Sequence, residues 1–293
     1  EAWYQEIGRA GRDGLPSDCV IFYSWSDVIG YDSFLTNIED ESKREETRAK
    51  TTDLFNMLDR GGCRHQALVA YFDETTGAIL AEDGTIVKYI GDAVMAVWGA
   101  PLPDPRQADR AVQAAWEMHL AGEREIAGYR FRTRIGIGTG PVLSGNLGSQ
   151  YRFDYTCIGD TTNFAARLEG MNKRFGTSVL LSDATVRQLS PGRFHVRPLG
   201  RFVAAGKKEA RAIHELLGPG AAGPRPAWVG VFEEALAKFA ARDWNAAGVL
   251  FQAVITARGG TDGPSTFYLD WMRGLQAVPP PPGWEGEVRF TEK

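Results

Sequence analysis

The sequence has little cysteine and no long apolar run. Its 293 residues hold three widely spaced cysteines, Cys19, Cys63 and Cys157, so neither a disulfide framework nor a complete zinc site can be read from them. No apolar stretch approaches the ~20 residues of a membrane-spanning helix, and no signal peptide is recognisable. We expect a cytoplasmic protein. Since the chain begins at Glu1 without a methionine, we expect it to be a fragment of a longer protein. One alternative for this longer protein is a membrane-anchored one, of which the chain forms the cytoplasmic part.

The chain also lacks a strong charge of one sign. Its net charge is −4, with 43% hydrophobic and 24% charged residues, which is ordinary for a globular protein. Bulk attraction to nucleic acid or to a membrane surface is therefore not expected. The length allows one to three domains.

Strand and helix patterns alternate between residues 75 and 217. Residues 84–99 predict two strands joined at Gly91-Asp92, a dipeptide typical of tight hairpins. A helix is expected after Pro105. Apolar spacing predicts strands over 132–138 and 151–158 and a helix over 161–175. This mixture indicates an α/β (α+β) core.

The remaining segments differ in composition. Residues 218–227 are rich in proline and glycine and predict a linker. Two helices are expected at 228–241 and 244–257, and a third at 263–276 ahead of the Pro279–Pro282 breaker.

Four polar residues of the central segment could carry chemistry. Asp92, at a hairpin tip, offers the hard oxygen ligand of a metal-dependent enzyme, or it is simply a good turn residue. Lys88 lies in an otherwise apolar strand, which requires a partner for its ammonium or an edge position. Asn163 and Arg167, at i and i+4, project from one helix face, although surface residues often show this spacing.

Three motifs, in order, resemble the class III nucleotidyl cyclases: GTIVKYIGDAVMAVWGAP, RIGIGTGPVLSGNLGS and RFDYTCIGDTTNFAARLEGMNKRFG. The resemblance covers about 140 residues. It implies a ferredoxin-like domain over residues 75–217 that works as a head-to-tail homodimer, with ATP bound at the subunit interface.

The resemblance implies a role for each site residue. Asp92 would bind metal, in a site for two Mg²⁺ or Mn²⁺ ions. Lys88 and Thr156 would recognise adenine, because an ammonium can donate to a ring nitrogen and a hydroxyl can accept from the exocyclic amine. Asn163 would orient the ribose, and Arg167 would stabilise charge on the α-phosphate. Lys207 would bind the triphosphate.

One part of the family pattern is missing. The family begins with a strand that ends in a second metal-binding aspartate, and nothing before residue 71 continues the pattern convincingly. We therefore expect a sheet that lacks its first strand, with an exposed edge or with residues 17–23 recruited to cover it. Loss of a metal ligand predicts weak activity.

Residues 1–74 resemble a different family. YQEIGRAGRDG resembles the last motor motif of RecQ-type helicases, which implies γ-phosphate-binding roles for Gln5, Arg9 and Arg12. The sequence has no phosphate-binding loop of the G-x-x-x-x-G-K-[ST] type, so these residues are expected to be non-functional. CRHQALVAYFDE resembles the start of the RecQ zinc subdomain. Its other cysteines do not follow Cys63, so zinc is not expected.

Residues 228–293 resemble a tetratricopeptide-type helical hairpin, which cannot bury its apolar face alone and should dock on the cyclase domain. Three functions remain open. The leading one is an adenylyl cyclase domain, impaired by the missing aspartate. The others are an inactive cyclase remnant in a chimeric chain and a fragment of an ATP-dependent RecQ-type DNA helicase. The residues AYFDE fit both families, which favours a chimera over an evolved fusion.

Overall fold

The computed structural model describes residues 64–90, 93–126, 129–130, 132–149, 152–203 and 209–290, together with Arg44 and Arg48. The chain divides into two compact units, Glu1–Cys63 and Arg64–Lys293, and the fold below is that of the second. Predictions for the RecQ-like residues Gln5, Arg9, Arg12 and Cys63, and for the recruited segment 17–23, fall outside the described residues.

The second unit begins with a helix and a β-hairpin. Helix α4 spans Arg64–Ala81, and strands β1, Thr85–Ile90, and β2, Ala93–Val97, pair antiparallel. The predicted hairpin is therefore confirmed on both sides of its tip. The indole nitrogen of Trp98 donates to the carbonyl of Glu82 at 2.8 Å and ties the hairpin to the end of α4. The boundary predicted at residue 75 lies inside α4.

Helix α5, Gln107–Glu123, packs against α4 through small side chains, and begins two residues after Pro105. Buried alanines allow the close approach of the two helices. Buried Asp109 accepts a hydrogen bond from the backbone nitrogen of Ser190 at 2.9 Å, which fixes α5 to the loop after the short helix α7, Asp183–Val186.

A five-stranded sheet forms the centre, in the order β11-β9-β10-β8-β5. Strand β10 runs antiparallel to β8 and β9, whereas β5 is parallel to β8 and β11 is parallel to β9. The five strands have these bounds: β5 Ile135–Ile137, β8 Val179–Ser182, β9 Phe194–Val203, β10 Arg211–Pro219 and β11 Glu287–Arg289.

One edge of this sheet is open in the part of the chain that the structure describes. Strand β5 has β8 on one side only, and the β1–β2 hairpin forms a sheet of its own. The prediction of a missing first strand, with the edge exposed or covered by residues 17–23, stays a prediction, because that segment falls outside the described residues. Two further pairs stand apart: β3, Glu125–Ile126, with β4, Tyr129–Arg130, and β6, Leu143–Ser149, with β7, Arg152–Ile158.

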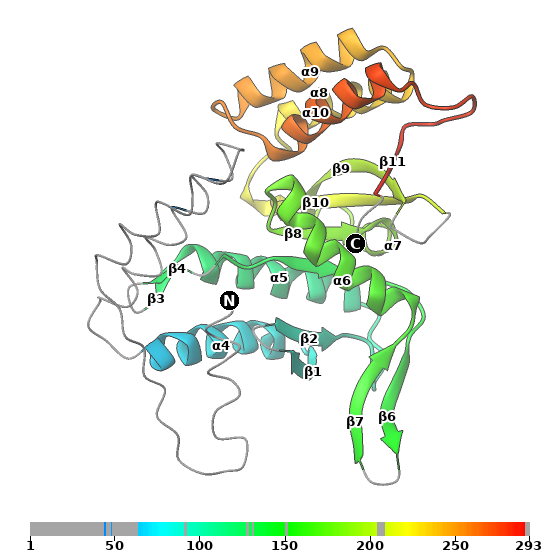
Figure 1. Ribbon diagram of the computed structural model, residues 1–293. Helices are drawn as coiled ribbons and strands as arrows, with labels where there is room; N and C mark the ends of the chain where they lie inside the picture. Colours follow the sequence, from blue (N-terminus) through cyan, green and yellow to red (C-terminus); the bar gives the residue numbers. More distant parts are fainter. Residues whose placement is uncertain are drawn as a thin grey trace. The chain divides into compact units, whose positions relative to one another are not determined.

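Figure 1 shows β6 and β7 as a long arm that extends from the start of α6, Asp160–Phe175. Strand β7 and helix α6 match the predictions at 151–158 and 161–175 closely. Beyond β10, the turn η1 covers Gly220–Ala222, so only residues 223–226 connect without regular structure.

Three helices follow within a residue of their predicted bounds: α8 Ala227–Ala240, α9 Trp244–Ala257 and α10 Gly263–Ala277. The side chains of Asp243 and Asp262 cap α9 and α10 by accepting from Ala246 and Ser265 backbone nitrogens. One hydrophobic core joins these helices to the sheet and α6; it includes Phe175, Leu199 and Phe202 on one side and Phe232, Phe251 and Tyr268 on the other. The expected docking is thus observed, and the tetratricopeptide likeness stays a prediction.

Candidate functional site

Helix α6 carries two of the predicted site residues. Gly159, whose φ is 149°, turns the chain out of β7, and the helix ends at Gly176 with a left-handed φ of 65°. Leu168, Asn172 and Phe175 face the core. Asn163 is exposed and Arg167 is half-buried, one turn apart. The helix therefore offers an amide and a guanidinium to solvent while its other face is held.

The helix is fixed to the sheet by a close backbone contact at Gly136 in β5. A Cβ at this position would lie 2.2 Å from the carbonyl oxygen of Ala165 and 2.4 Å from the nitrogen of Glu169. The side-chain nitrogen of Asn172 also donates to the carbonyl of Ile135 at 2.9 Å. Asn163 and Arg167 are thus carried on a helix with little freedom to shift.

Strands β1 and β7, which carry Lys88 and Thr156, contact each other. Both side chains are half-buried. Burial raises the pKa of the neighbouring Cys157 thiol, and the positive charge of Lys88 acts in the opposite direction and lowers it. The ammonium of Lys88 is therefore within electrostatic reach of the strand segment that carries Thr156.

The simpler interpretation of Lys88 also fits the geometry. Within the described residues, β1 pairs only with β2, so it is an edge strand on which a lysine can extend its ammonium to water. The proximity to β7 distinguishes Lys88 from an ordinary surface lysine, but this proximity alone does not assign it a ligand.

Two predicted site residues fall outside the described residues. Asp92 follows Ile90 at the hairpin tip, and Lys207 lies in the connection between Val203 of β9 and Glu209. Across the described ranges, no three His, Cys, Asp or Glu side chains gather as a metal site. The metal role of Asp92 and the triphosphate role of Lys207 stay predictions.

Sequence reasoning missed four exposed apolar side chains on β1, β6 and β7. Tyr89, Ile90, Leu143 and Ile158 are each at least half exposed, and Leu143 pairs directly with Ile158 across the β6–β7 arm. Strand alternation around residue 158 could have indicated this exposure, because Cys157 and Ile158 must face opposite sides.

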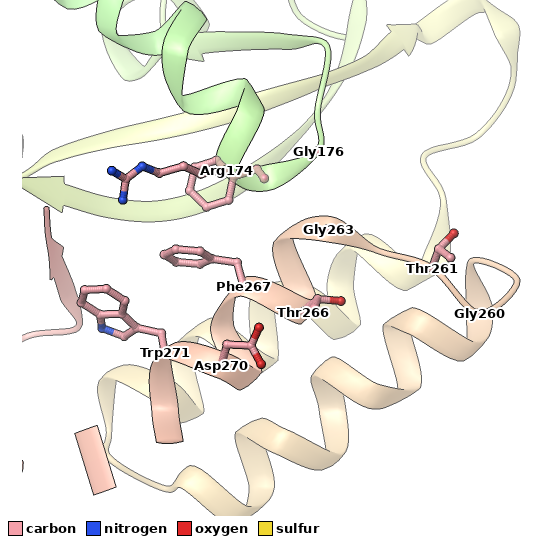
Figure 2. Close-up of a pocket in the computed structure, with 10 residues that line it drawn as sticks. Arg174, Gly176, Gly260, Thr261, Gly263, Thr266, Phe267, Asp270 and Trp271 are labelled. Atoms are coloured by element: carbon pink, nitrogen blue, oxygen red, sulfur yellow. The ribbon is translucent and has the colours of Figure 1, made fainter. Parts of the chain in front are cut away.

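A cavity lies elsewhere in the described residues. It measures about 560 Å³ and is lined by Arg174, Phe175 and Gly176 at the end of α6 and by residues 260–271 around α10. Figure 2 shows Arg174 across from Phe267 and Trp271. None of the predicted site residues lines it.

No helix in the described ranges is long and apolar enough to cross a membrane.

The profile of the adenylate and guanylate cyclase catalytic domain matches residues 45–216, more than half of the chain. The chain belongs to this family. The match to the cyclase profile begins before residue 75, where we placed the start of the cyclase segment, and it includes all of α4. The three motifs that suggested the family lie inside the matched range.

Adenylate cyclase 1 of Rhizobium meliloti (strain 1021) is 40% identical over 186 residues, 60% of this chain and 28% of that protein. The adenylate cyclase of Anabaena cylindrica is 38% identical over 151 residues, 47% of this chain and 29% of its own length. This chain thus spans less than a third of the length of either relative. Among solved structures, the catalytic core of a rhodopsin-guanylyl cyclase with converted specificity, in complex with ATPαS, is 28% identical with a TM-score of 0.46, over 56% of this chain and 89% of that one.

Proposed function

We propose that this cyclase domain converts ATP to 3′,5′-cyclic AMP and pyrophosphate. The observation that supports the proposal is the placement of Asn163 and Arg167 on the outer face of α6, which is held closely against the sheet, together with the contact between β1, which carries Lys88, and β7, which carries Thr156. The resemblance to adenylate cyclases supports ATP over GTP as the substrate.

Each residue has a role suited to its chemistry. The ammonium of Lys88 donates to a ring nitrogen of adenine, and the hydroxyl of Thr156 accepts from the exocyclic amine. The amide of Asn163 orients the ribose. The guanidinium of Arg167, which is always charged, stabilises the negative charge that develops on the α-phosphate when the 3′-hydroxyl attacks it. Lys207 would hold the leaving pyrophosphate.

Asp92 is the residue of the chain proposed to bind metal. Its carboxylate oxygens suit Mg²⁺ or Mn²⁺, ions that favour hard oxygen ligands. When bound, such ions lower the pKa of the attacking hydroxyl and hold the triphosphate.

We propose that the active unit is a head-to-tail homodimer. Tyr89 and Ile90 of β1, Leu143 of β6 and Ile158 of β7 are exposed, and apolar surface exposed in this way often marks a protein interface. A second copy that covers it would exclude water from the nucleotide and bring the Asp92 of one subunit toward the Arg167 of the other.

Activity is expected to be weak, because the family's second metal-binding aspartate has no counterpart in the pattern of this sequence. A folded but inactive cyclase in a chimeric chain is the alternative, and it predicts no turnover at all. The RecQ-like function rests on residues 1–74, of which the structure describes Arg44, Arg48 and residues 64–74.

A turnover assay separates these possibilities. Cyclic AMP formed from ATP is measured with Mn²⁺ and with Mg²⁺ for the natural chain, Arg167→Ala and Asp92→Asn, with Arg273→Ala as a control on the exposed face of α10. We expect low turnover that both site variants abolish and the control retains. Equal product from the natural chain and Arg167→Ala would overturn the proposal.

A further inference from the structure

Arg211, the first residue of β10, contacts the N-terminal turn of α6 in two ways. Its guanidinium donates to a carboxylate oxygen of Asp160, the first residue of the helix. The same group lies over the ring of Phe164, with 4.8 Å between its central carbon and the ring centroid. Arg211 therefore contacts residues at both ends of the first turn of α6.

The turn that Arg211 contacts includes Asn163. Asn163 lies between Asp160 and Phe164 in the sequence, and its backbone nitrogen donates to the carbonyl of Gly159 at 3.2 Å. Arg167 follows one turn later on the same face. The N-cap residue Gly159 offers no side-chain hydrogen bond, so the start of the helix depends on contacts from other elements.

Arg211 also stands at the end of the connection that contains Lys207. Strand β9 ends at Val203, and Arg211 opposes Phe202 in the β9–β10 register. The guanidinium thus links the base of this connection to α6.

We infer that Arg211 is a positioning residue, which sets the first turn of α6, and with it Asn163 and Arg167, for the reaction. This inference rests on the proposed cyclase function. Arg211 does not touch substrate in this account; it acts through the helix that does.

Energetic considerations separate this role from simple stabilisation. Arg211 and Asp160 are each about two-fifths exposed, and ion pairs with that exposure contribute little to folding. A small displacement of a reacting group, by contrast, can lower a rate by about 100-fold. Loss of Arg211 should therefore change turnover much more than melting temperature.

The test compares the natural chain with Arg211→Ala, Arg211→Lys and the control Arg201→Ala, whose exposed side chain pairs with Glu285 instead. Lysine keeps the charge but loses the planar contact with Phe164, so it should rescue only part of the effect. Three quantities are measured: the kcat and KM for ATP with Mn²⁺, the melting temperature, and hydrogen exchange of the peptide that covers residues 159–167.

For Arg211→Ala we expect kcat to fall by about 10- to 100-fold with a smaller change in KM. Exchange in residues 159–167 should quicken by about tenfold while the melting temperature stays within about 2 °C. Unchanged exchange, or faster exchange with unchanged kcat, overturns the inference. Absence of turnover in the natural chain refutes the proposed function instead, and the exchange result then decides by itself whether Arg211 holds the helix.

Discussion

Arg197 of β9 and Asp262, the N-cap of α10, form a buried ion pair in which neither side chain is exposed. The Nη1 atom of Arg197 donates to both carboxylate oxygens, at 2.9 and 3.0 Å. Glu215 on β10 accepts from the same guanidinium, and the rings of Trp228 and Phe232 lie 4.9 and 4.7 Å from it. A charge at the centre of the domain thus joins the sheet to two of the C-terminal helices.

Replacing Arg197 with alanine should destabilise the fold by about 3–5 kcal/mol, because buried Glu215 loses its partner and Asp262 keeps only Arg258 as a cationic partner. Urea unfolding followed by circular dichroism measures the change. Burial already raises the pKa of Glu215 against the opposing charge of Arg197, so the loss should be larger at pH 8 than at pH 5. Arg201→Ala, exposed on the same strand, is the control and should change stability by less than about 1 kcal/mol.

Gly136→Ala should destabilise the domain by about 1–3 kcal/mol, because the new methyl group would overlap the backbone of α6. The matched control is Gly170→Ala on α6 itself, where a Cβ meets nothing within 4 Å. That variant should stabilise the helix by about 0.5–1 kcal/mol. Thermal melting of both variants checks the prediction, and an unchanged melting temperature for Gly136→Ala contradicts the rigid contact described here.

His214 should make stability depend on pH. Burial lowers its pKa; Asp183 and Glu233 act to raise it, and Arg187 acts to lower it. When folding lowers the pKa of a histidine, the folded protein keeps its full stability at pH values above the ordinary histidine pKa of about 6.5. Stability is lost as the pH falls below that value, because the unfolded chain then binds the proton more readily than the folded one. Urea midpoints between pH 7.5 and 5 should therefore decline less in His214→Gln than in the natural protein.

The Asp183→Asn variant provides the opposite change. It removes the carboxylate that accepts a hydrogen bond from Nε2 of His214 at 3.2 Å, so the pKa of His214 should fall further and the loss of stability in acid should grow. Parallel declines in all three proteins would show that other groups govern the pH dependence.

Lys88→Glu should reduce turnover of ATP by about 10- to 100-fold, the equivalent of one lost hydrogen bond from a charged donor. A carboxylate cannot donate to the adenine ring. Product formation from ATP and from GTP is measured side by side, with Lys238→Glu on α8 as the charge-matched control. Full ATP turnover by Lys88→Glu would contradict the proposed adenine contact and favour the interpretation of Lys88 as a solvated lysine on an edge strand.

Local elements of the fold were predictable and remote pairings were not. The β1–β2 hairpin and α6 follow from turn residues and apolar spacing, which act within a few residues. Strand β9 escaped prediction because Pro198 and Gly200 interrupt its pattern. Strand β11 has three residues and follows a proline run, and its parallel partner β9 lies far away in the sequence.

The same division holds for the site. Asn163 and Arg167 share a helix, so their common face could be predicted from their spacing. The approach of Lys88 to the Thr156 segment depends on contacts between β1 and β7, and only the family resemblance indicated it. Arg211 was missed because its partners Asp160 and Phe164 lie about fifty positions earlier.

The Arg197–Asp262 pair has a consequence for how the protein is made. Asp262 follows Arg197 by 65 residues, so a growing chain on the ribosome presents the arginine long before this carboxylate has been synthesised. Until then β9 cannot close its core without burying an incompletely paired charge. Nascent chains halted before residue 262 should therefore stay open and depend on chaperones, and folding of the sheet should wait for the last helix.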